Sequence, residues 1–430
     1  MTDTRIRSIH ARQVMDCKFR PVLEVSVMLE SGISGQGAAP TGTSVGSHEA
    51  AVIRDYDPDK FCGLSVFQAI ENVDKVLGPA LKGMDVMDQE AIDRKMIELD
   101  GTENKSVLGG NAIYSVSIAC AKAAAEAWGK SLYQAIAGRK LRTIPLPAAN
   151  SIIGGRYADK TVCFQEFTFC PYRAKDMEEA MEIIYHVHHA IGDIFSRELG
   201  GAPALIGNSH GWQPPTEDPE EIMQLMSEAV KKCGYEDKVA YVLDMAASEM
   251  YDDKTDTYYL NGAQVTAGQQ ITYIKNLTEK YPFLFIEDIL QENDWKGFAR
   301  ASEEIKKTIL IGDDLTITSP KLLRKAHEEK AVQGFVFKPN QIGTITEAIE
   351  ARNYAREHQM ITVPSQRGGG TIWDVVIDLG VGLEAEACKS CAPRGGESVY
   401  AMNCLYRAAQ ENPEASMYDF GPLVKFIDKK

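Results

Sequence analysis

Long hydrophobic runs are absent from this 430-residue sequence: no stretch of about 18 residues is both uncharged and apolar enough to span a bilayer. The first residues, Met-Thr-Asp-Thr-Arg-Ile-Arg, are polar and lack the apolar segment and cleavage site of a secretory signal. We therefore expect a cytoplasmic protein with no membrane partner.

Positive charge is also scarce. The chain has 46 Lys and Arg against 61 Asp and Glu, which gives a formal net charge of −15. Because binding to a phosphate backbone requires clustered Lys and Arg, and no long basic run is present, we expect no nucleic-acid partner. An acidic protein can still bind an anionic small molecule in a local cationic pocket.

Cysteine occurs nine times, an odd number, without the dense spacing of a disulfide framework. Cys388 and Cys391 form a C-x-x-C pair. A zinc site would need a second pair, and a redox motif would need a thioredoxin-like βαβ context. The pattern therefore favours reduced thiols.

The N-terminal third of the chain changes its periodicity once. Apolar and polar residues alternate through about the first 60 residues, as in Val22–Glu30, which predicts an antiparallel sheet with Gly-rich turns. From about Val66 to Gly138 the spacing becomes helical. We predict an α+β domain over residues 1–138, with a boundary marked by Pro145 and Pro147, which disfavour a helix.

Short apolar strands recur beyond about residue 240, and most of them end in a charged residue. Glu287, Asp313 and Lys338 are 26 and 25 residues apart, the length of one strand plus one amphipathic helix and two short loops. This period predicts an α/β fold with a (βα)8-type barrel over residues 139–430. The expected strands are 239–244, 283–287, 308–313, 334–338 and 360–364, with helices at 319–331 and 344–358.

Parallel barrel strands bring their carboxyl ends together on the catalytic face. One charged residue at a strand end is more often simply solvated, but Asp244, Glu287, Asp313 and Lys338 recur in register. Three carboxylates form an oxygen-only site suited to Mg²⁺. Lys338 would act as a general base if nearby cations disfavour its charged form.

Two further cations fit an anionic substrate. Lys389 lies about one strand period beyond Pro364 and could hold a substrate carboxylate. Arg367, followed by three glycines, offers a guanidinium beside backbone N–H groups for a phosphate. The glycine run alone fits a flexible loop equally well.

These residues lie in motifs that make the sequence resemble the enolase family across essentially its whole length. The resemblance implies a small α+β cap on a barrel with irregular early connections, a homodimer, and Mg²⁺-dependent dehydration of 2-phosphoglycerate to phosphoenolpyruvate. The matching motifs include Gln165-Glu166-Phe167, Asp244 with Ala247-Ser248-Glu249, Phe285-Ile286-Glu287-Asp288, Gly312-Asp313-Asp314-Leu315-Thr316, Lys338 with Asn340-Gln341-Ile342-Gly343, Lys389 with Ala392-Pro393, and the loop Thr41 to Ala50.

The resemblance also implies roles for individual residues. One Mg²⁺ would be held tightly, and a second would arrive with the substrate. The implied roles are Asp244, Glu287 and Asp313 as ligands of the tighter metal, Ser44 as a ligand of the second, Lys338 as the base at C2, Gln165 and Glu166 as pocket residues, and Arg367 and Lys389 as phosphate and carboxylate ligands.

The chain departs from the family around the leaving group. Ser209 stands where enolases carry a general-acid glutamate, and loss of that acid would reduce the rate by about 10²- to 10⁴-fold. His210 is a possible substitute, although its side chain is expected to point elsewhere. Tyr157 and Gln366 each replace a family histidine. We expect Ser209, His210, Tyr157 and Gln366 to line the pocket.

Three hypotheses follow. The first is a divergent lyase that keeps proton abstraction but acts on a different phosphorylated or phosphonate C3 acid, as carboxyphosphonoenolpyruvate synthases do. The second is an ordinary phosphopyruvate hydratase that tolerates the replacements. The third is a non-catalytic metal-binding homologue, which Lys338 and Lys389 disfavour because a structural metal site needs neither lysine.

Overall fold

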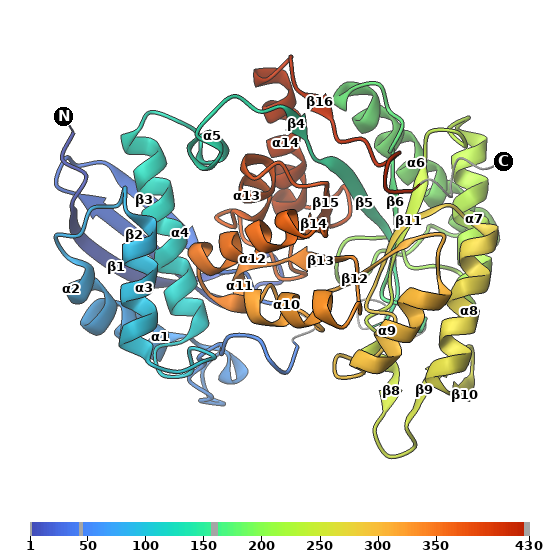
Figure 1. The fold of residues 1–430 in the computed structure, drawn as a ribbon, viewed down its shortest axis with the longest axis horizontal. Coiled ribbons are helices and arrows are strands. Elements are labelled where there is room, and N and C mark those ends of the chain that lie inside the picture. Colours follow the sequence, from blue (N-terminus) through green and yellow to red (C-terminus); the bar gives the residue numbers. More distant parts are fainter. Residues whose placement is uncertain (1, 43–45, 156–161, 425–430) are drawn as a thin grey trace.

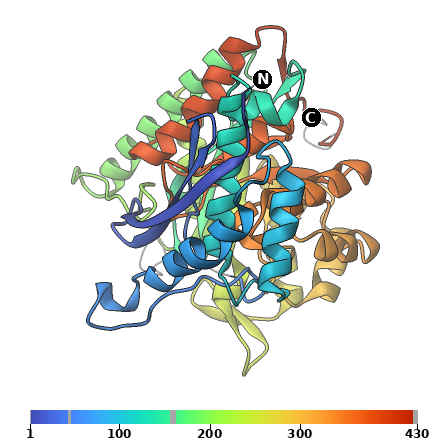
Figure 2. The same cartoon turned by 90° about the vertical axis from the view of Figure 1, so that its left-hand side faces the viewer.

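A computed structural model describes residues 2–42, 46–155 and 162–424. Its N-terminal part is an antiparallel sheet with strand order β1-β2-β3, packed on helix α4 (Gly110–Ala127), as Figures 1 and 2 show. The strands are β1 (Ile6–Met15), β2 (Pro21–Leu29) and β3 (Ser34–Ala38). A Cβ on Gly35 would lie 2.2 Å from the Ala119 carbonyl oxygen, so glycine there lets the helix backbone approach β3 closely.

Helices follow this sheet, which confirms the predicted change of periodicity, although the strands end at Ala38 rather than near residue 60. Helix α3 begins where the Asp88 side chain accepts the Ala91 N–H, a capping interaction. The remaining helical segments here are η1 (Phe61–Gly63), α1 (Phe67–Asn72), η2 (Val73–Leu77), α2 (Gly78–Leu81), α3 (Gln89–Asp100) and α5 (Leu132–Ala137).

The rest of the described chain is built on an eight-stranded sheet in the order β14-β13-β12-β11-β7-β6-β5-β15. A parallel bridge between Ser365 and Lys389 links the β14 and β15 ends, so the sheet curls into a nearly closed barrel. Strand β6 is antiparallel to both neighbours, which is the irregular start that the resemblance implied. The strands are β5 (Leu146–Ile153), β6 (Glu166–Cys170), β7 (Ala240–Asp244), β11 (Phe283–Glu287), β12 (Ile309–Gly312), β13 (Gly334–Phe337), β14 (Ile361–Pro364) and β15 (Ala387–Ser390).

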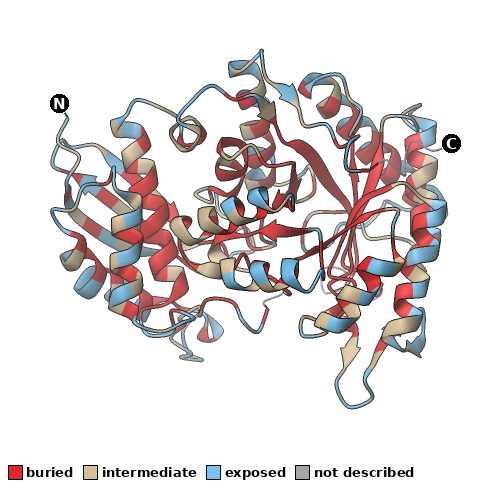
Figure 3. Ribbon diagram, in the orientation of Figure 1, coloured by how far each residue is buried: buried red, intermediate tan, exposed pale blue. Residues whose placement is uncertain are grey.

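Helices cover the outside of this barrel and present their buried faces to it, as Figure 3 shows. The predicted βα repeat is confirmed, with Ser319 and Thr344 capping α10 and α12. No helix in the described ranges is long and apolar enough to cross a membrane. The helices are α6 (Met177–Glu198), α7 (Pro219–Lys232), η4 (Ala247–Met250), α8 (Ala267–Lys280), α9 (Trp295–Glu304), α10 (Pro320–Glu328), α11 (Pro339–Ile342), α12 (Ile345–Glu357), α13 (Val376–Gly382) and α14 (Gly396–Glu411).

Short strands complete the described fold as two small sheets. One is a pair at the ends of the barrel segment, and the other is an antiparallel three-stranded sheet that projects from it (Figure 1). The pair is β4 (Thr143–Ile144) and β16 (Ser416–Met417), and the three-stranded sheet is β8 (Tyr251–Asp252), β9 (Thr257–Leu260) and β10 (Ala263–Val265).

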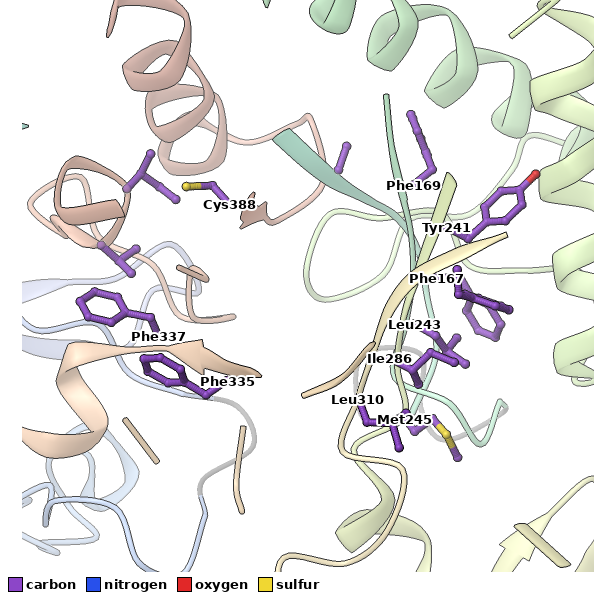
Figure 4. Packing of buried hydrophobic residues seen from close by; sticks show 14 of the residues in the cluster. Phe167, Phe169, Tyr241, Leu243, Met245, Ile286, Leu310, Phe335, Phe337 and Cys388 are labelled. Atoms are coloured by element: carbon purple, nitrogen blue, oxygen red, sulfur yellow. The ribbon is translucent and has the colours of Figure 1, made fainter. Parts of the chain in front are cut away.

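Strand alternation decides which side chains reach the barrel interior. Figure 4 shows Phe167 and Phe169 of β6 in the layer between the strands and the helices. Because successive side chains of a strand point to opposite faces, Glu166 points to the inner side. Glu166 is paired in register with Asp244 of β7. The same alternation that builds the core therefore brings carboxylates to the barrel mouth.

Candidate active site

The charged strand ends predicted from the sequence converge at the carboxyl-terminal mouth of the barrel. Asp244 and Glu287 are the last residues of β7 and β11 and are directly paired in register. Asp313 and Lys338 follow the last residues of β12 and β13. All four side chains are buried, as is that of Lys389 in β15.

Lys389 is the cation that holds Asp244 and Glu287 together with a third carboxylate, Glu166. Its Nζ lies 2.5 Å from Glu287 Oε2, 2.9 Å from Asp244 Oδ2 and 3.1 Å from Glu166 Oε2. Burial by itself would lower the pKa of Lys389, but the carboxylates, Asp244 foremost, hold it well above its usual value. The ammonium group therefore pairs with three protein carboxylates at the barrel mouth.

Lys338 is paired with Asp313 in the same way. Its Nζ donates to Asp313 Oδ2, and although burial opposes the charge, Asp313 and Glu287 raise the pKa of the lysine above its usual value. The Thr318 hydroxyl donates to Gln341 Oε1 at 3.1 Å, and Gln341 Nε2 donates to Asp313 Oδ1 at 2.7 Å. Thr318 Oγ1 also accepts the Lys338 backbone N–H at 2.8 Å. This network positions the lysine and the carboxylate together.

The donor set fits the predicted Mg²⁺. Asp244, Glu287 and Asp313 offer only carboxylate oxygens, which are the ligands that Mg²⁺ prefers. Glu287 Oε1 is buried and has no hydrogen-bond partner within the described ranges. An unpaired buried carboxylate oxygen is unfavourable by itself, and coordination to a cation would satisfy it.

A second acidic cluster lies beside this one. Ligand oxygens of Asp288, Asp313 and Asp314 all lie within 4.8 Å of one another. Both oxygens of Asp288, however, already accept backbone N–H groups, those of Asp313 and Asp314, at 2.9 Å each. Asp288 therefore acts as a structural acceptor, and Glu287 is the better candidate for a metal ligand.

Arg367 meets the N-terminal part of the chain at the same mouth. Its guanidinium nitrogens lie 2.9 and 3.1 Å from the two carboxylate oxygens of Glu49, and both side chains are buried. Gln341 Nε2 also approaches Glu49 Oε1, at 3.5 Å. Glu49 thus connects the loop after β3 to the barrel mouth, a link across 318 residues that no local pattern predicts.

The remaining predicted pocket residues are placed as follows. Gln165 donates from Nε2 to Asp244 Oδ2 at 3.3 Å. Gln366 Oε1 accepts the Cys391 N–H, and its Nε2 donates to the Glu397 carbonyl oxygen, both at 3.3 Å. Ser209 is buried, and its Oγ has no hydrogen-bond partner among the residues that the structure describes.

His210 lies next to Ser209 with its Nδ1 3.5 Å from Glu397 Oε1. Ser44 and Tyr157 lie outside the described residues. Glu397 was not singled out from the sequence, because nothing in a helix-start glutamate distinguishes it from other acidic residues in first turns.

Comparison with known proteins agrees with this architecture. The family model for the N-terminal domain of enolase matches residues 6–136, and the model for the C-terminal TIM barrel domain of enolase matches residues 141–424. An enolase of Methanopyrus kandleri is 39% identical over 426 residues, which cover 98% of this chain and 99% of that protein. An enolase of Methanococcus maripaludis is 37% identical over 406 residues, 94% of this chain and 95% of that protein.

These matches extend along both parts of the fold and account for nearly all of the sequence. They confirm the resemblance inferred from the motifs and the prediction of a carbon–oxygen lyase of the enolase type. The chain belongs to the enolase family.

Proposed function

We propose that this protein is a Mg²⁺-dependent lyase that removes the proton next to the carboxylate of a 2-phosphoglycerate-like C3 acid, phosphorylated or phosphonate. The observation that carries this proposal is the pair of buried lysines among the carboxylates at the barrel mouth. Lys338 contacts Asp313, and Lys389 contacts Asp244, Glu287 and Glu166. A purely structural metal site would need neither lysine inside it.

In this proposal Lys338 Nζ accepts the proton from C2. Lys338 must first lose a proton, although Asp313 and Glu287 favour its protonated form. We assign these two carboxylates, together with Asp244, as the ligands of Mg²⁺. When bound, Mg²⁺ would stabilise the negative charge that develops on the substrate carboxylate. Gln341 keeps Asp313 oriented through its 2.7 Å hydrogen bond.

The substrate would be held by the other cations at the mouth. We assign the substrate carboxylate to Lys389 and the phosphate or phosphonate group to Arg367, which lies buried against Glu49. Ser44 would bind the second Mg²⁺, and Glu166, Gln165, Gln366 and Tyr157 would line the pocket. By family resemblance we also propose a homodimer that works in the cytoplasm.

We propose that the step after proton abstraction is catalysed differently from that of glycolytic enolase, with turnover of 2-phosphoglycerate below typical enolase rates. Ser209 cannot donate a proton as a tuned carboxylic acid does, and its hydroxyl is buried. The alternative is an ordinary phosphopyruvate hydratase, and the 39% identity to a curated enolase over 98% of the chain favours it. Formation of phosphoenolpyruvate from 2-phosphoglycerate at typical enolase rates, followed by absorbance, would establish that alternative.

Exchange of the C2 proton tests the part that both functions share. In D2O with Mg²⁺, NMR should show deuterium incorporation at C2 of 2-phosphoglycerate or of a phosphonate C3 acid. The exchange should stop in Lys338→Ala and on removal of Mg²⁺ with EDTA. Lys321→Ala is the matched control, because Lys321 is exposed and pairs with exposed Glu103. If the wild type shows no exchange with any such acid, the hypothesis of a non-catalytic metal-binding homologue would remain.

A further inference from the structure

His210 adopts a backbone conformation that favours glycine. Its φ is 66°, in the left-handed region, where histidine is tolerated better than most residues but still at a cost. Hydrogen bonds hold the loop in this shape: the His210 N–H donates to the Gly207 carbonyl and the Trp212 indole N–H donates to the His188 carbonyl. The loop therefore presents the imidazole in a defined direction.

The imidazole occupies a defined space next to Glu397. Its Nδ1 lies 3.5 Å from Glu397 Oε1. A Cβ on Gly395 would come within 2.9 Å of the same nitrogen, so glycine at 395 makes room for the ring. The side chain of His210 is 32% exposed and that of Glu397 13%, which leaves the pair partly open.

Glu397 also touches the candidate active site. Its carbonyl oxygen accepts from Gln366 Nε2, and Gln366 Oε1 accepts the Cys391 N–H. Gln366 is adjacent to Arg367, and Cys391 is two residues beyond Lys389. The imidazole therefore lies at the rim formed by the loops that carry the substrate-binding cations, and it comes from the residue next to Ser209.

We propose that His210, positioned by Glu397, donates the proton to the leaving oxygen and so replaces the acid that Ser209 cannot supply; this step depends on the proposed function. The C3–O bond breaks and its electron pair stays on oxygen, which takes the Nε2 proton and departs as water. The electron pair left at C2 after proton transfer to Lys338 forms the C2–C3 double bond. The imidazolium becomes neutral imidazole.

Several titratable or charged side chains surround the imidazole. Glu397 approaches it from the start of α14, and the Cys17 thiol faces Glu397 from the turn between β1 and β2. Burial raises the pKa of Cys17 to about 11, with a contribution from Glu397, so this thiol is uncharged at neutral pH. Burial also raises the pKa of the Cys391 thiol to about 12, with contributions from Glu166 and Glu397. The Arg394 guanidinium lies 5.1 Å from the centroid of the Trp212 ring, two residues along the chain from His210.

His210→Gly is the primary test, because glycine suits a φ of 66° and the fold should be retained. We expect phosphoenolpyruvate formation from 2-phosphoglycerate to fall by about 10²-fold or more, with C2 proton exchange retained. Added imidazole should restore elimination, and so should Ser209→Glu in the same background. His186→Ala, which removes an exposed histidine hydrogen-bonded to Tyr235, should behave as wild type.

Glu397→Gln tests the positioning role. Because the amide would orient the imidazole less well, kcat for elimination should fall while KM for 2-phosphoglycerate and C2 exchange stay at wild-type values, whereas a purely structural role would change all three. His210→Gln, which keeps a polar side chain without an acid, should lose elimination as His210→Gly does.

Each failure has its own signature. Wild type without C2 exchange would refute the proposed function. Wild type that exchanges but does not eliminate, or His210→Gly that eliminates at the wild-type rate, would overturn only the role of His210. Loss of elimination in His210→Gly without rescue by either imidazole or Ser209→Glu would also overturn it.

Discussion

Glu287 and Asp288 are consecutive buried acids at the end of β11, yet their oxygens meet different partners. Both oxygens of Asp288 accept backbone N–H groups from the loop after β12. Glu287 has one oxygen against Lys389 and the other with no hydrogen-bond partner among the described residues. Within the described residues, hydrogen bonds therefore satisfy both oxygens of Asp288 but only one oxygen of Glu287.

This difference separates a structural acid from a candidate ligand. An unsatisfied buried oxygen costs roughly 1–3 kcal/mol, so a carboxylate kept in that state points to a partner from outside the chain. Burial, and then Asp244, raise the pKa of Glu287 well above its usual value. Substitution of Glu287 should therefore affect activity more than stability, and substitution of Asp288 should affect stability more than activity.

Glu287→Gln should have the largest effect on activity. The amide keeps the size of the side chain but removes a charged ligand, so Mg²⁺-dependent C2 exchange should fall by about 10²-fold or more. Thermal stability should stay equal or rise, because a buried charge is lost while Lys389 keeps Asp244 and Glu166. Mg²⁺ titration calorimetry and thermal unfolding measure the two effects. Unchanged Mg²⁺ affinity would assign Glu287 to structure.

Gln341→Leu should have the next largest effect, since it removes the amide that orients Asp313 and approaches Glu49. We expect a loss of about 10- to 100-fold in C2 exchange or Mg²⁺ affinity, as for other residues that orient metal ligands. Gln341→Glu keeps a hydrogen-bonding side chain but repels Asp313, so it should not restore activity. Wild-type exchange rates in Gln341→Leu would show that Asp313 needs no such support.

Asp288→Asn should change stability more than activity. One of the two backbone N–H groups that now donate to Asp288 would then face the NH2 group of the asparagine side chain. The free energy of unfolding should therefore fall by about 1–3 kcal/mol. C2 exchange should fall less than about tenfold, since no ligand that we propose is removed. Urea unfolding and exchange kinetics on the same preparation measure both. A larger loss of Mg²⁺ affinity than in Glu287→Gln would reverse the two roles.

Asp93→Asn should have the smallest effect on activity, because Asp93 lies away from the barrel mouth, where it accepts from the Thr346 N–H and hydroxyl. Burial raises the pKa of Asp93 from 3.8 to about 6. The folded state then binds the proton more tightly than the unfolded chain. This contribution to stability is complete below about pH 4 and is lost as the pH rises through about 6, by up to about 1.4 kcal/mol per pH unit. Asp93→Asn should remove this slope in urea titrations at several pH values, and an unchanged slope would contradict the shift.

Local sequence predicted the elements with regular periods best. The strands proposed at 283–287 and 334–338 correspond to β11 and β13, and the helix at 344–358 corresponds to α12. Their apolar spacing and caps are contained in a few adjacent residues. Family resemblance implied only irregular early connections, and the antiparallel pairing of β6 was not predicted, because pairing joins segments whose local patterns look alike.

The residues at the site divide in the same way. The strand-end carboxylates and lysines could be found from the sequence, because each closes a short apolar strand and parallel strands share one carboxyl-terminal face. The ion-pair partners of these residues could not be found from the sequence. Lys389 lies 145 residues from Asp244 and 102 from Glu287, and Arg367 lies 318 residues from Glu49.

The sequence by itself determined the fold class, the family and which charged side chains reach the barrel mouth, since those follow from local period and motif. Only the tertiary structure decided that Glu287 keeps an oxygen without a partner, that Asp288 does not, and that His210 lies beside Glu397. The physical reason is that hydrogen bonds and ion pairs depend on distances of about 3 Å between loops far apart in the chain, which no local pattern encodes.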